Sequence, residues 1–351
     1  MHKASSFKYL GDTVHKSGKN MINIIERRTK AYAIFAEIRA ILEDVPLGKY
    51  RTQIGLQLRQ AMFVNRVLFN TEVWHGLKPK DIEILSIVDH QILRYIIQAH
   101  AKTPNEFLYL ETGAIPLSFI IASRRMIYLQ NILKREPTKL VRRVFEAQKS
   151  KPTKGDFIEL VLEDFELTNI TYNENVIIAM GQNEYKSYIK KHIKNAALVH
   201  LKTLQATHSK VDSIKYSCLE TQSYLTDHVF SNKEAALLTA LRSHTLRGLK
   251  MNFSSWFLPD LQCSLKCVGE QDSQEHLLTC KPLLKELSEH QKLAVQKVKF
   301  EDIYNNPNCQ KEAVIIFSLL LDAREKLLEA GKPTSGSSLD AAPPVGDRGL
   351  Y

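Results

Sequence analysis

The amino-acid sequence predicts a mainly α-helical protein with a short β segment at its N-terminus and a small cysteine- and histidine-containing segment near its C-terminus. Three observations support this fold class. Apolar residues recur at helical spacing over most of the 351 residues. The 14 glycines and 12 prolines are sparse and fall mainly between these periodic segments. Three of the five cysteines lie close together, between Cys263 and Cys280.

The N-terminal residues have a different pattern from the rest of the chain. Polar and apolar side chains alternate over Ser6–Leu10 and Gly11 follows, so we expect a strand and a turn. A long helix is expected after Gly18. Its apolar stripe consists of Ile24, Ala31, Ile34, Ile38 and Ile41, and the basic residues largely outside the stripe are Arg27, Arg28 and Lys30.

Further helices follow along the chain. Pro46 and Gly48 interrupt the helical pattern, which resumes over Lys49–Trp74. A third helix is expected over Pro79–Gln98, where proline suits the first turn. The expected buried face of the second helix consists of Ile54, Leu58, Met62, Val67 and Leu68. Later helices are expected at residues 105–111, 117–134, 139–148, 156–165, 184–205, 231–242, 282–296 and 311–330.

Three segments depart from this helical pattern. A loop over residues 169–182 is the expected internal boundary, and residues 212–225 are expected to include a short strand. Residues 331–351 are rich in Gly, Pro, Ser and Ala. They are expected to be disordered, because this composition cannot bury enough apolar surface to offset the loss of chain entropy.

The net charge indicates the kind of partner, and the lengths of the apolar runs indicate whether the chain crosses a membrane. The net charge of +10 and the pI of about 9.2 favour a polyanionic partner, such as nucleic acid or an acidic membrane surface. The alternative is a basic protein with no specific polyanionic partner. Polar residues follow Met1, and no apolar run approaches the roughly 20 residues of a membrane helix. We therefore expect a protein that is neither secreted nor membrane-bound.

The strongest local motif is the series Cys263-x3-Cys267-x8-His276-x3-Cys280. Three cysteines and one histidine are a standard ligand set for Zn2+, which prefers four tetrahedral ligands. The first pair can chelate from a tight turn, where Gly269 helps the chain to reverse, and the second pair has the i, i+4 spacing of one helical face. Four ligands leave no position for water, so the predicted zinc is structural. The alternative is a set of ordinary buried cysteines with a surface histidine.

Other residues of chemical interest are assigned structural roles. Cys218 and Cys309 have no neighbouring ligands in the sequence and are expected to be core cysteines. The histidines expected to pack or to cap, rather than to act as ligands or bases, include His75, His100 and His244. The acidic residues interpreted as a solvated helix face, rather than as catalytic acids, are Asp156, Glu159, Glu163 and Asp164.

Four segments, namely Phe7–Asp12, Ile24–Ala40, Leu68–Trp74 and Cys263–Cys280, follow one another in an order that resembles LINE-type (non-LTR) retrotransposon reverse transcriptases. Phe7-Lys8-Tyr9-Leu10-Gly11-Asp12 resembles the segment that follows the catalytic palm motifs in this family. The basic helix over Ile24–Ala40 and the Glu-x-Trp of Leu68–Trp74 are similar to the segments that come next. Cys263–Cys280, with Gln274-Glu275-His276-Leu277-Leu278 inside it, resembles the family's cysteine–histidine knuckle.

The resemblance covers residues 6–285 and has implications for catalysis. The family's polymerase uses an Asp-Asp motif near two magnesium ions, upstream of the Lys-Tyr-Leu-Gly segment, and no Asp-Asp pair occurs in this sequence. Polymerase activity is therefore not expected from this chain alone, and residues 281–351 are too short for the endonuclease of some relatives. The implied parts are a palm remnant with the primer-contacting strand (1–16), a thumb-like helical bundle (17–100), a helical linker domain (101–250), a zinc knuckle (251–285), C-terminal helices (286–330) and a disordered tail (331–351).

The resemblance also implies a nuclear or cytoplasmic location and contacts with nucleic acid. In the family, the Lys-Tyr-Leu-Gly segment lies near the primer end and the thumb contacts the duplex backbone. The residues that this assigns to nucleic-acid binding are Lys8, Tyr9, Gly11, Arg27, Arg28 and Lys30, with Lys266 of the knuckle as a further phosphate contact. Basic side chains suit phosphates, which set affinity but carry no sequence information. The alternative for the basic residues of the long helix is that they solvate its exposed face.

Two functions are compatible with the sequence. The first is a nucleic-acid-binding, zinc-containing C-terminal fragment of a LINE-type reverse transcriptase (an RNA-directed DNA polymerase), with RNA, DNA or both as its partner. The second is a zinc-stabilised helical protein-interaction module with no nucleic-acid role. The first predicts binding that weakens steeply with salt. The second predicts that exposed apolar patches, rather than basic ones, dominate the surface.

Overall fold

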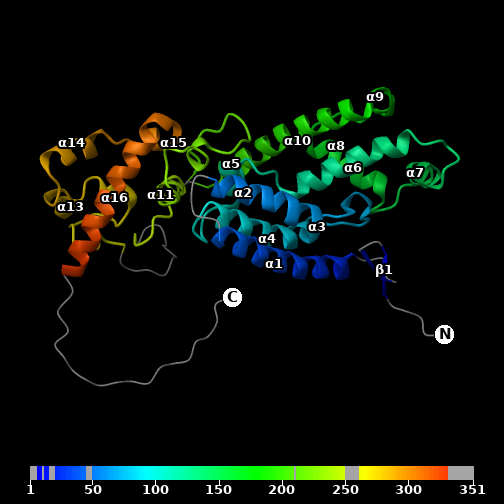
Figure 1. Ribbon diagram of the computed structural model, residues 1–351. Helices are drawn as coiled ribbons and strands as arrows, with labels where there is room; N and C mark the ends of the chain where they lie inside the picture. Colours follow the sequence, from blue (N-terminus) through cyan, green and yellow to red (C-terminus); the bar gives the residue numbers. More distant parts are fainter. Residues whose placement is uncertain are drawn as a thin grey trace, which may run out of the picture. The chain divides into compact units, whose positions relative to one another are not determined.

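The computed structural model describes residues 6–9, 12–15, 20–44, 50–208, 211–249 and 261–330. These residues are mainly helical, as predicted (Figure 1). Several predictions fall on residues outside this description, namely those on Leu10, Gly11, Gly18, Pro46 and Gly48, on residues 251–260 of the expected knuckle domain and on the expected disordered tail at 331–351.

The chain divides into two compact units. The large unit comprises residues 1–248 and 298–314, and the small unit comprises residues 249–297 and 315–351. Helix α16 (Pro307–Ala330) contributes its first residues to the large unit and the rest to the small unit. The finer division of the chain into six parts stays a prediction.

The N-terminal β segment is an antiparallel hairpin. Strand β1 (Ser6–Tyr9) pairs with β2 (Asp12–His15), so that the strand expected from the alternating pattern is followed by a second one. The Thr13 hydroxyl donates to Glu26 Oε2 at 2.7 Å. This hydrogen bond connects the hairpin to the first helix of the large unit.

The first helices of the large unit match the predicted pattern, with a different end to the second helix. They are α1 (Met21–Asp44), α2 (Arg51–Leu58), the π-helical segment η1 (Arg59–Val64), α3 (Asn65–Val67), the 3-10 segment η2 (Thr71–Val73) and α4 (Pro79–Ile96). Helix α1 packs against α4. The continuous helix ends at Val67 rather than at Trp74, because Asn70 adopts a left-handed conformation with a φ of 60°.

The face of α2 and η1 that packs against α4 is not the predicted one. A Cβ at Gly55 would lie 2.7 Å from Ile96 Cγ1, so the missing side chain allows a close approach of the two helices. Arg59 Nε and Nη2 donate to the two carboxylate oxygens of Asp89 at 2.6 and 2.7 Å. Gly55 and the Arg59–Asp89 ion pair therefore determine which face of α2 and η1 is buried against α4. Three residues of the predicted buried face are only half-buried, namely Ile54, Leu58 and Met62.

In the second half of the large unit, a helix lies where the sequence predicts a domain boundary. Its elements are α5 (Asn105–Thr112), α6 (Leu117–Leu133), α7 (Leu140–Ser150), α8 (Phe157–Leu167), α9 (Glu174–Ala179), α10 (Gln182–Gln205), η3 (Ser223–Leu225), α11 (Asn232–Arg242) and α15 (Phe300–Asn305). Gln130 of α6 donates to the backbone oxygens of Ile177 and Met180 at 2.8 and 3.0 Å. These bonds tie α9 to α6, so the boundary predicted at residues 169–182 is wrong.

Residues 212–225 form turns, a single bridge and η3 instead of the predicted strand. Thr221 makes an isolated antiparallel bridge with Thr112. Gly113 has a φ of +67°, and a Cβ at this position would lie 2.5 Å from the carbonyl carbon of Glu220. Glycine at position 113 therefore lets this segment pass directly over the C-terminal end of α5.

A buried ion pair joins α5 to α11. Arg242 Nη2 and Nε donate to Glu111 Oε1 at 2.7 and 3.1 Å, and neither side chain is more than 2% exposed. The Tyr216 hydroxyl donates to the same oxygen. Arg242 also donates to the backbone oxygens of Ile303 and Tyr304 in α15. One guanidinium thus holds together α5, α11, α15 and the segment before η3.

The small unit contains short helices and the C-terminal part of α16. Its short helices are α12 (Gln274–Leu277), α13 (Lys281–Lys285) and α14 (Glu289–Lys297). The single helix predicted over residues 282–296 is therefore two helices. Ser288 Oγ accepts from the Gln291 amide at 3.3 Å and Gln291 Oε1 accepts from the Ser288 amide at 2.9 Å, which is a capping box that begins a new helix.

The length and hydropathy of the helices bear on membrane insertion. In the part of the chain that the structure describes, none of them combines the length and the apolar character needed to cross a bilayer.

Replacing Arg242 with Met should lower the free energy of unfolding of the large unit by about 3–5 kcal/mol, because the Glu111 carboxylate would stay buried without its cation. The double variant Glu111→Leu with Arg242→Met should lose markedly less, since apolar residues can replace a buried ion pair at little cost. Urea unfolding followed by circular dichroism measures both. Equal losses in the single and double variants would show that packing, rather than the unpaired charge, dominates.

Candidate metal centre

The first two cysteines of the motif lie in a tight loop of the small unit. The Cys263 amide donates to Glu270 O and the Lys266 amide donates to Cys263 O, both at 2.9 Å. Lys266 and Gly269 have positive φ angles of 62° and 74°, which reverse the chain within a few residues. The loop therefore brings Cys267 back towards Cys263, as the predicted tight turn requires.

The other two candidate ligands lie at α12 and directly after it. The Ser273 hydroxyl accepts a hydrogen bond from the His276 amide at 3.2 Å and so caps α12. Cys280 precedes α13 and lies four residues after His276. The cap fixes the start of the helical turn that carries His276.

The four side chains converge on one point. Their ligand atoms all lie within 4.8 Å of one another. Cys280 Sγ lies 4.0 Å from Cys263 Sγ and 3.7 Å from Cys267 Sγ. Zinc–thiolate bonds of about 2.3 Å in a tetrahedron place two sulfurs about 3.8 Å apart. The cluster could therefore hold a metal ion such as zinc.

The chemistry of the cluster also fits a cation. Both ring nitrogens of His276 are buried, and within the described residues neither has a hydrogen-bond partner. A buried polar atom of this kind is costly, and a bound metal ion would satisfy one of the two. Burial raises the pKa of the Cys280 thiol to about 12 and also raises the pKa of Cys267. A cation would reverse this effect, because it stabilises the thiolate form.

Asp272 braces the ligand loop. Its carboxylate accepts from Ser264 Oγ at 2.8 Å and from Arg324 Nη2 of α16 at 2.8 and 3.0 Å. Its amide donates to Leu261 O at 2.8 Å. The sequence did not reveal this role, because Asp272 and Arg324 lie 52 residues apart and neither belongs to a ligand motif.

The residues assigned to nucleic-acid contacts belong to both units. Lys8 of β1 and Arg28 and Lys30 of α1 are exposed in the large unit, and Lys266 is exposed in the small unit. Gly11 and the side chain of Tyr9 lie outside what the structure describes. The contacts of these residues with nucleic acid stay a prediction.

Arg27 belongs to the interior of the large unit, in contrast to the predicted phosphate contact. Its side chain is 4% exposed. The guanidinium donates to the backbone oxygens of Val67 and Arg66 at 2.7 and 3.3 Å and lies 4.6 Å from the centre of the Trp74 ring. Arg27 therefore holds the Glu-x-Trp segment against α1, and its donors are used within the fold.

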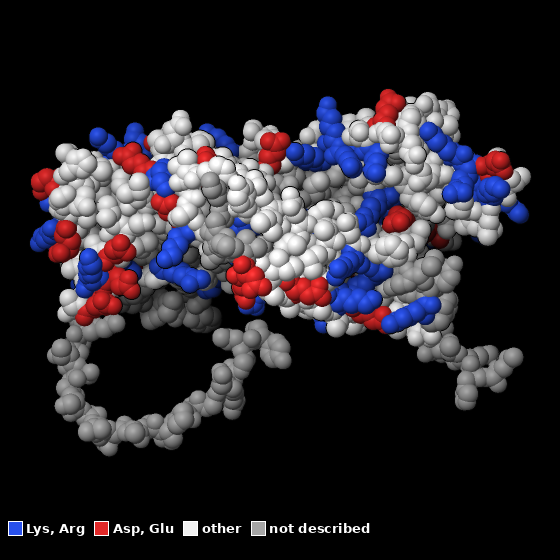
Figure 2. All heavy atoms as spheres, viewed as in Figure 1, with Lys and Arg blue, Asp and Glu red and all other residues white. Residues whose placement is uncertain are grey.

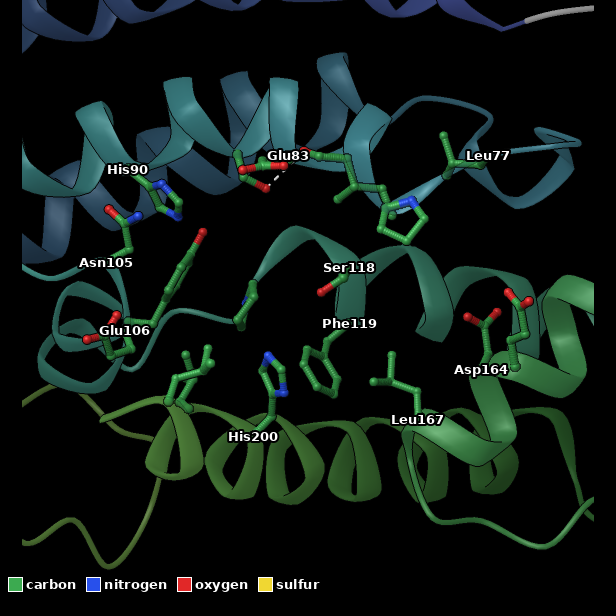
Figure 3. A pocket seen from close by; sticks show the side chains of 18 of the residues that line it. Leu77, Glu83, His90, Asn105, Glu106, Ser118, Phe119, Asp164, Leu167 and His200 are labelled. Atoms are coloured by element: carbon green, nitrogen blue, oxygen red, sulfur yellow. Dashed lines mark hydrogen bonds between the residues drawn. The ribbon is translucent and has the colours of Figure 1, made fainter. Parts of the chain in front are cut away.

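A separate cavity of about 600 Å³ lies in the large unit among α4, α5, α6, α8 and α10 (Figure 3). His90 and His200 line it from α4 and α10, and the His200 ring lies 5.5 Å from the Phe119 ring. Burial lowers the pKa of His90 to about 4, so its imidazole is neutral at pH 7. No sequence signal marks this cavity, since its lining comes from five separate helices.

Two further predictions differ from the structure. Asp164 is 3% exposed and accepts hydrogen bonds from Arg125 Nε and Nη2 at 2.6 and 2.7 Å, so it belongs to a buried ion pair and not to a solvated face. Cys218 is exposed and Cys309 is half-buried, so neither is the core cysteine that was expected. The first error arises because a helical pattern alone does not show what packs against it, and the second because the residue type alone does not show where a cysteine lies.

No family model matches the chain, and neither the curated proteins nor the solved structures contain a significant match to it. The likeness to LINE-type reverse transcriptases therefore rests on the sequence motifs alone.

Replacing Cys280 with Ser should abolish zinc binding, because it removes one of the four ligands, whose sulfur lies 4.0 and 3.7 Å from those of Cys263 and Cys267. Purified wild-type protein should contain one zinc per chain by mass spectrometry of the metal, and the variant should contain almost none. Structural zinc contributes on the order of 10 kcal/mol in small modules, so the small unit should also lose its fold. Cys218→Ser, at an exposed position of the large unit, is the matched control and should keep its zinc. Full zinc content in the Cys280 variant would show that the ligand set is wrong.

Acid should destabilise the large unit in part through His90. Its pKa is about 4 when folded and 6.5 when the imidazole is exposed to water, so the unfolded chain takes up a proton between these values that the folded chain does not. Stability is therefore lost as the pH falls from 7 towards 4, by about 2 kcal/mol at pH 5 from this group. His90→Gln should remove that part of the pH dependence in urea unfolding at pH 7 and pH 5. An unchanged pH dependence would contradict the assignment.

Proposed function

We propose that this chain is a zinc-containing, nucleic-acid-binding C-terminal fragment of a LINE-type reverse transcriptase that lacks the catalytic palm. The observation that carries the proposal is the convergence of four side chains, Cys263, Cys267, His276 and Cys280, on one point. In the sequence, this cluster closes an ordered series of motifs that begins with Lys8-Tyr9-Leu10-Gly11.

The proposed zinc ion is structural. Four protein ligands complete its coordination, so the ion contributes folding energy and offers no open position for water. Glu270 Oε2 lies 3.5 Å from His276 Nδ1. Nδ1 forms no hydrogen bond in the described structure, but a proton on Nδ1 would face this carboxylate and leave Nε2 for the metal. Lys266 is exposed between the first two cysteines and supplies a phosphate contact beside the ion.

The basic residues of the hairpin and of α1 carry the nucleic-acid part of the proposal. Lys8, Arg28 and Lys30 are exposed. Figure 2 shows lysine and arginine side chains gathered near the end of α1 that lies beside β1. Contacts of this kind with phosphates set the affinity and the register but do not read sequence.

The proposal assigns residues 17–100 to a thumb-like bundle and residues 101–250 to a helical linker. Within the bundle, the Arg27 guanidinium over Trp74 is a structural joint between α1 and the Glu-x-Trp segment. No polymerase activity is proposed for this chain by itself, because its sequence contains no Asp-Asp pair to hold catalytic magnesium.

A specific observation favours the alternative, a zinc-stabilised protein-interaction module. Leu140 and Val144 of α7 are 74% and 47% exposed and lie one helical turn apart. Apolar side chains in this arrangement can dock against the groove of another protein. Two residues form a small patch, so we rank this function second.

The nucleic-acid proposal predicts salt-dependent binding of the full chain to RNA or DNA oligonucleotides. In fluorescence anisotropy, the logarithm of the association constant should fall linearly with the logarithm of the salt concentration. Replacing Arg28 and Lys30 with Gln should reduce the steepness of this line by about 1.4 to 1.8, which corresponds to two lost phosphate contacts. The matched control replaces Lys151 and Lys154, two exposed lysines outside the assigned set, and should change it little.

Two results would reject this function. One is the absence of binding to any oligonucleotide at low salt, and the other is binding that does not respond to salt. The interaction module would then be supported if the chain retains a protein partner through α7 and Leu140→Ser abolishes this retention.

A further inference from the structure

We propose that a basic groove between η1, α6 and α10 binds a single-stranded nucleic acid along its phosphate backbone. The proposal rests on the nucleic-acid binding proposed above. It assigns a binding site in the large unit that lies outside the residues suggested by the sequence motifs.

Two neighbouring hollows form this basic groove. One has a volume of about 810 Å³ and is lined from η1, α6 and α10, and the other has a volume of about 460 Å³ and is lined from η2, α6 and α10. Both are lined by Asn65, Arg124, Ile127 and Lys186, so they form one continuous groove. Figure 2 shows lysine and arginine side chains gathered over α10.

The α10 wall of the groove carries a row of three lysines. These lysines are spaced every four residues, at Lys186, Lys190 and Lys194. Successive side chains therefore leave the helix about 6 Å apart along its axis, on one face. Lys186 and Lys190 are exposed and form no ion pair with any acidic residue that the structure describes. Lys194 is half-buried and pairs with Glu220 at 3.1 Å. Two of the three charges are therefore available to an anionic ligand.

The opposite wall adds one more cation. Arg124 of α6 donates to the backbone oxygen of Leu68 and to Asn65 Oδ1, the latter at 3.5 Å, and lies near Glu72, the one carboxylate among the lining residues. Arg59 also lines the groove, but Asp89 neutralises its charge. The lining as a whole is positive, so it favours a ligand with a regular row of negative charges.

Aromatic and apolar side chains identify a single strand as the occupant. Phe69 is 50% exposed and Tyr128 is half-buried at the η2 end of the groove. The bases of a single strand present free faces that stack on such rings, whereas a duplex keeps its bases stacked internally and an acidic peptide has none. The side chains that surround the rings and line the floor are Gln60, Asn65, Asn131, Ile120, Ile127 and Ile193.

The lysine row gives the first test. The full chain is titrated by fluorescence anisotropy with oligouridylate and oligothymidylate of about 12 nucleotides, a site size typical of single-strand binders. Replacing Lys186 and Lys190 with Gln should weaken binding about tenfold at low salt and reduce the steepness of the salt dependence by about 1.4. The matched control replaces Lys191 and Lys202, two exposed lysines of α10 outside the groove lining, and should bind like the wild type.

The aromatic ring gives the second test. Phe69→Ala should weaken single-strand binding about tenfold and leave binding of a duplex of the same length unchanged, because only unstacked bases use the ring. All the replaced side chains are exposed, and thermal unfolding followed by circular dichroism checks that the variants fold.

Each alternative outcome has a distinct meaning. If the wild type binds oligonucleotides but the Lys186/Lys190 variant binds equally well, or the control weakens as much, the groove proposal is overturned and the proposed function stands. If the wild type binds no oligonucleotide at low salt, both fail. If polyglutamate binds more tightly than the oligonucleotides and competes through Lys186 and Lys190, the groove belongs to an acidic protein partner.

Discussion

Both units depend on one constraint, which is that a guanidinium buried in the interior must meet an acceptor from another element. Three arginines of the large unit meet carboxylates, in the pairs Arg59–Asp89, Arg125–Asp164 and Arg242–Glu111, and the small unit has Arg324–Asp272. Arg27 and Arg51 instead donate to backbone oxygens near helix ends, at Val67 and Leu42. An unpaired buried charge costs several kcal/mol, so a shift of these helices relative to each other is strongly disfavoured.

The same constraint explains how far the fold could be predicted from the sequence. Apolar residues at helical spacing located most helices, and α4, α6 and α10 begin and end within about two residues of expectation. The buried face of η1 was missed, because Arg59 looks like a solvated residue in a one-dimensional pattern. Its partner Asp89 lies 30 residues away, and nothing local marks the pair.

The candidate metal centre was easier to predict than its surroundings. All four candidate ligands fall between Cys263 and Cys280, so spacing alone brings them together. The contact of Asp272 with Arg324 and the groove lined by Arg124 could not be predicted from the sequence, because each brings together elements that are distant along the chain. The relation to LINE-type reverse transcriptases is a proposal, since it rests on short motifs whose order no comparison tests.

The discontinuous make-up of the small unit has a consequence for the order of events during synthesis. Its residues fall in two stretches, 249–297 and 315–351, with residues of the large unit between them. The candidate metal ligands leave the ribosome well before Arg324, so the ligand loop can close around an ion while Asp272 still lacks its guanidinium. Residues 298–314, which contain α15, must meanwhile reach Arg242. While residues 315–330 are still being made, the small unit is incomplete, and partly formed units of this kind are prone to misfolding.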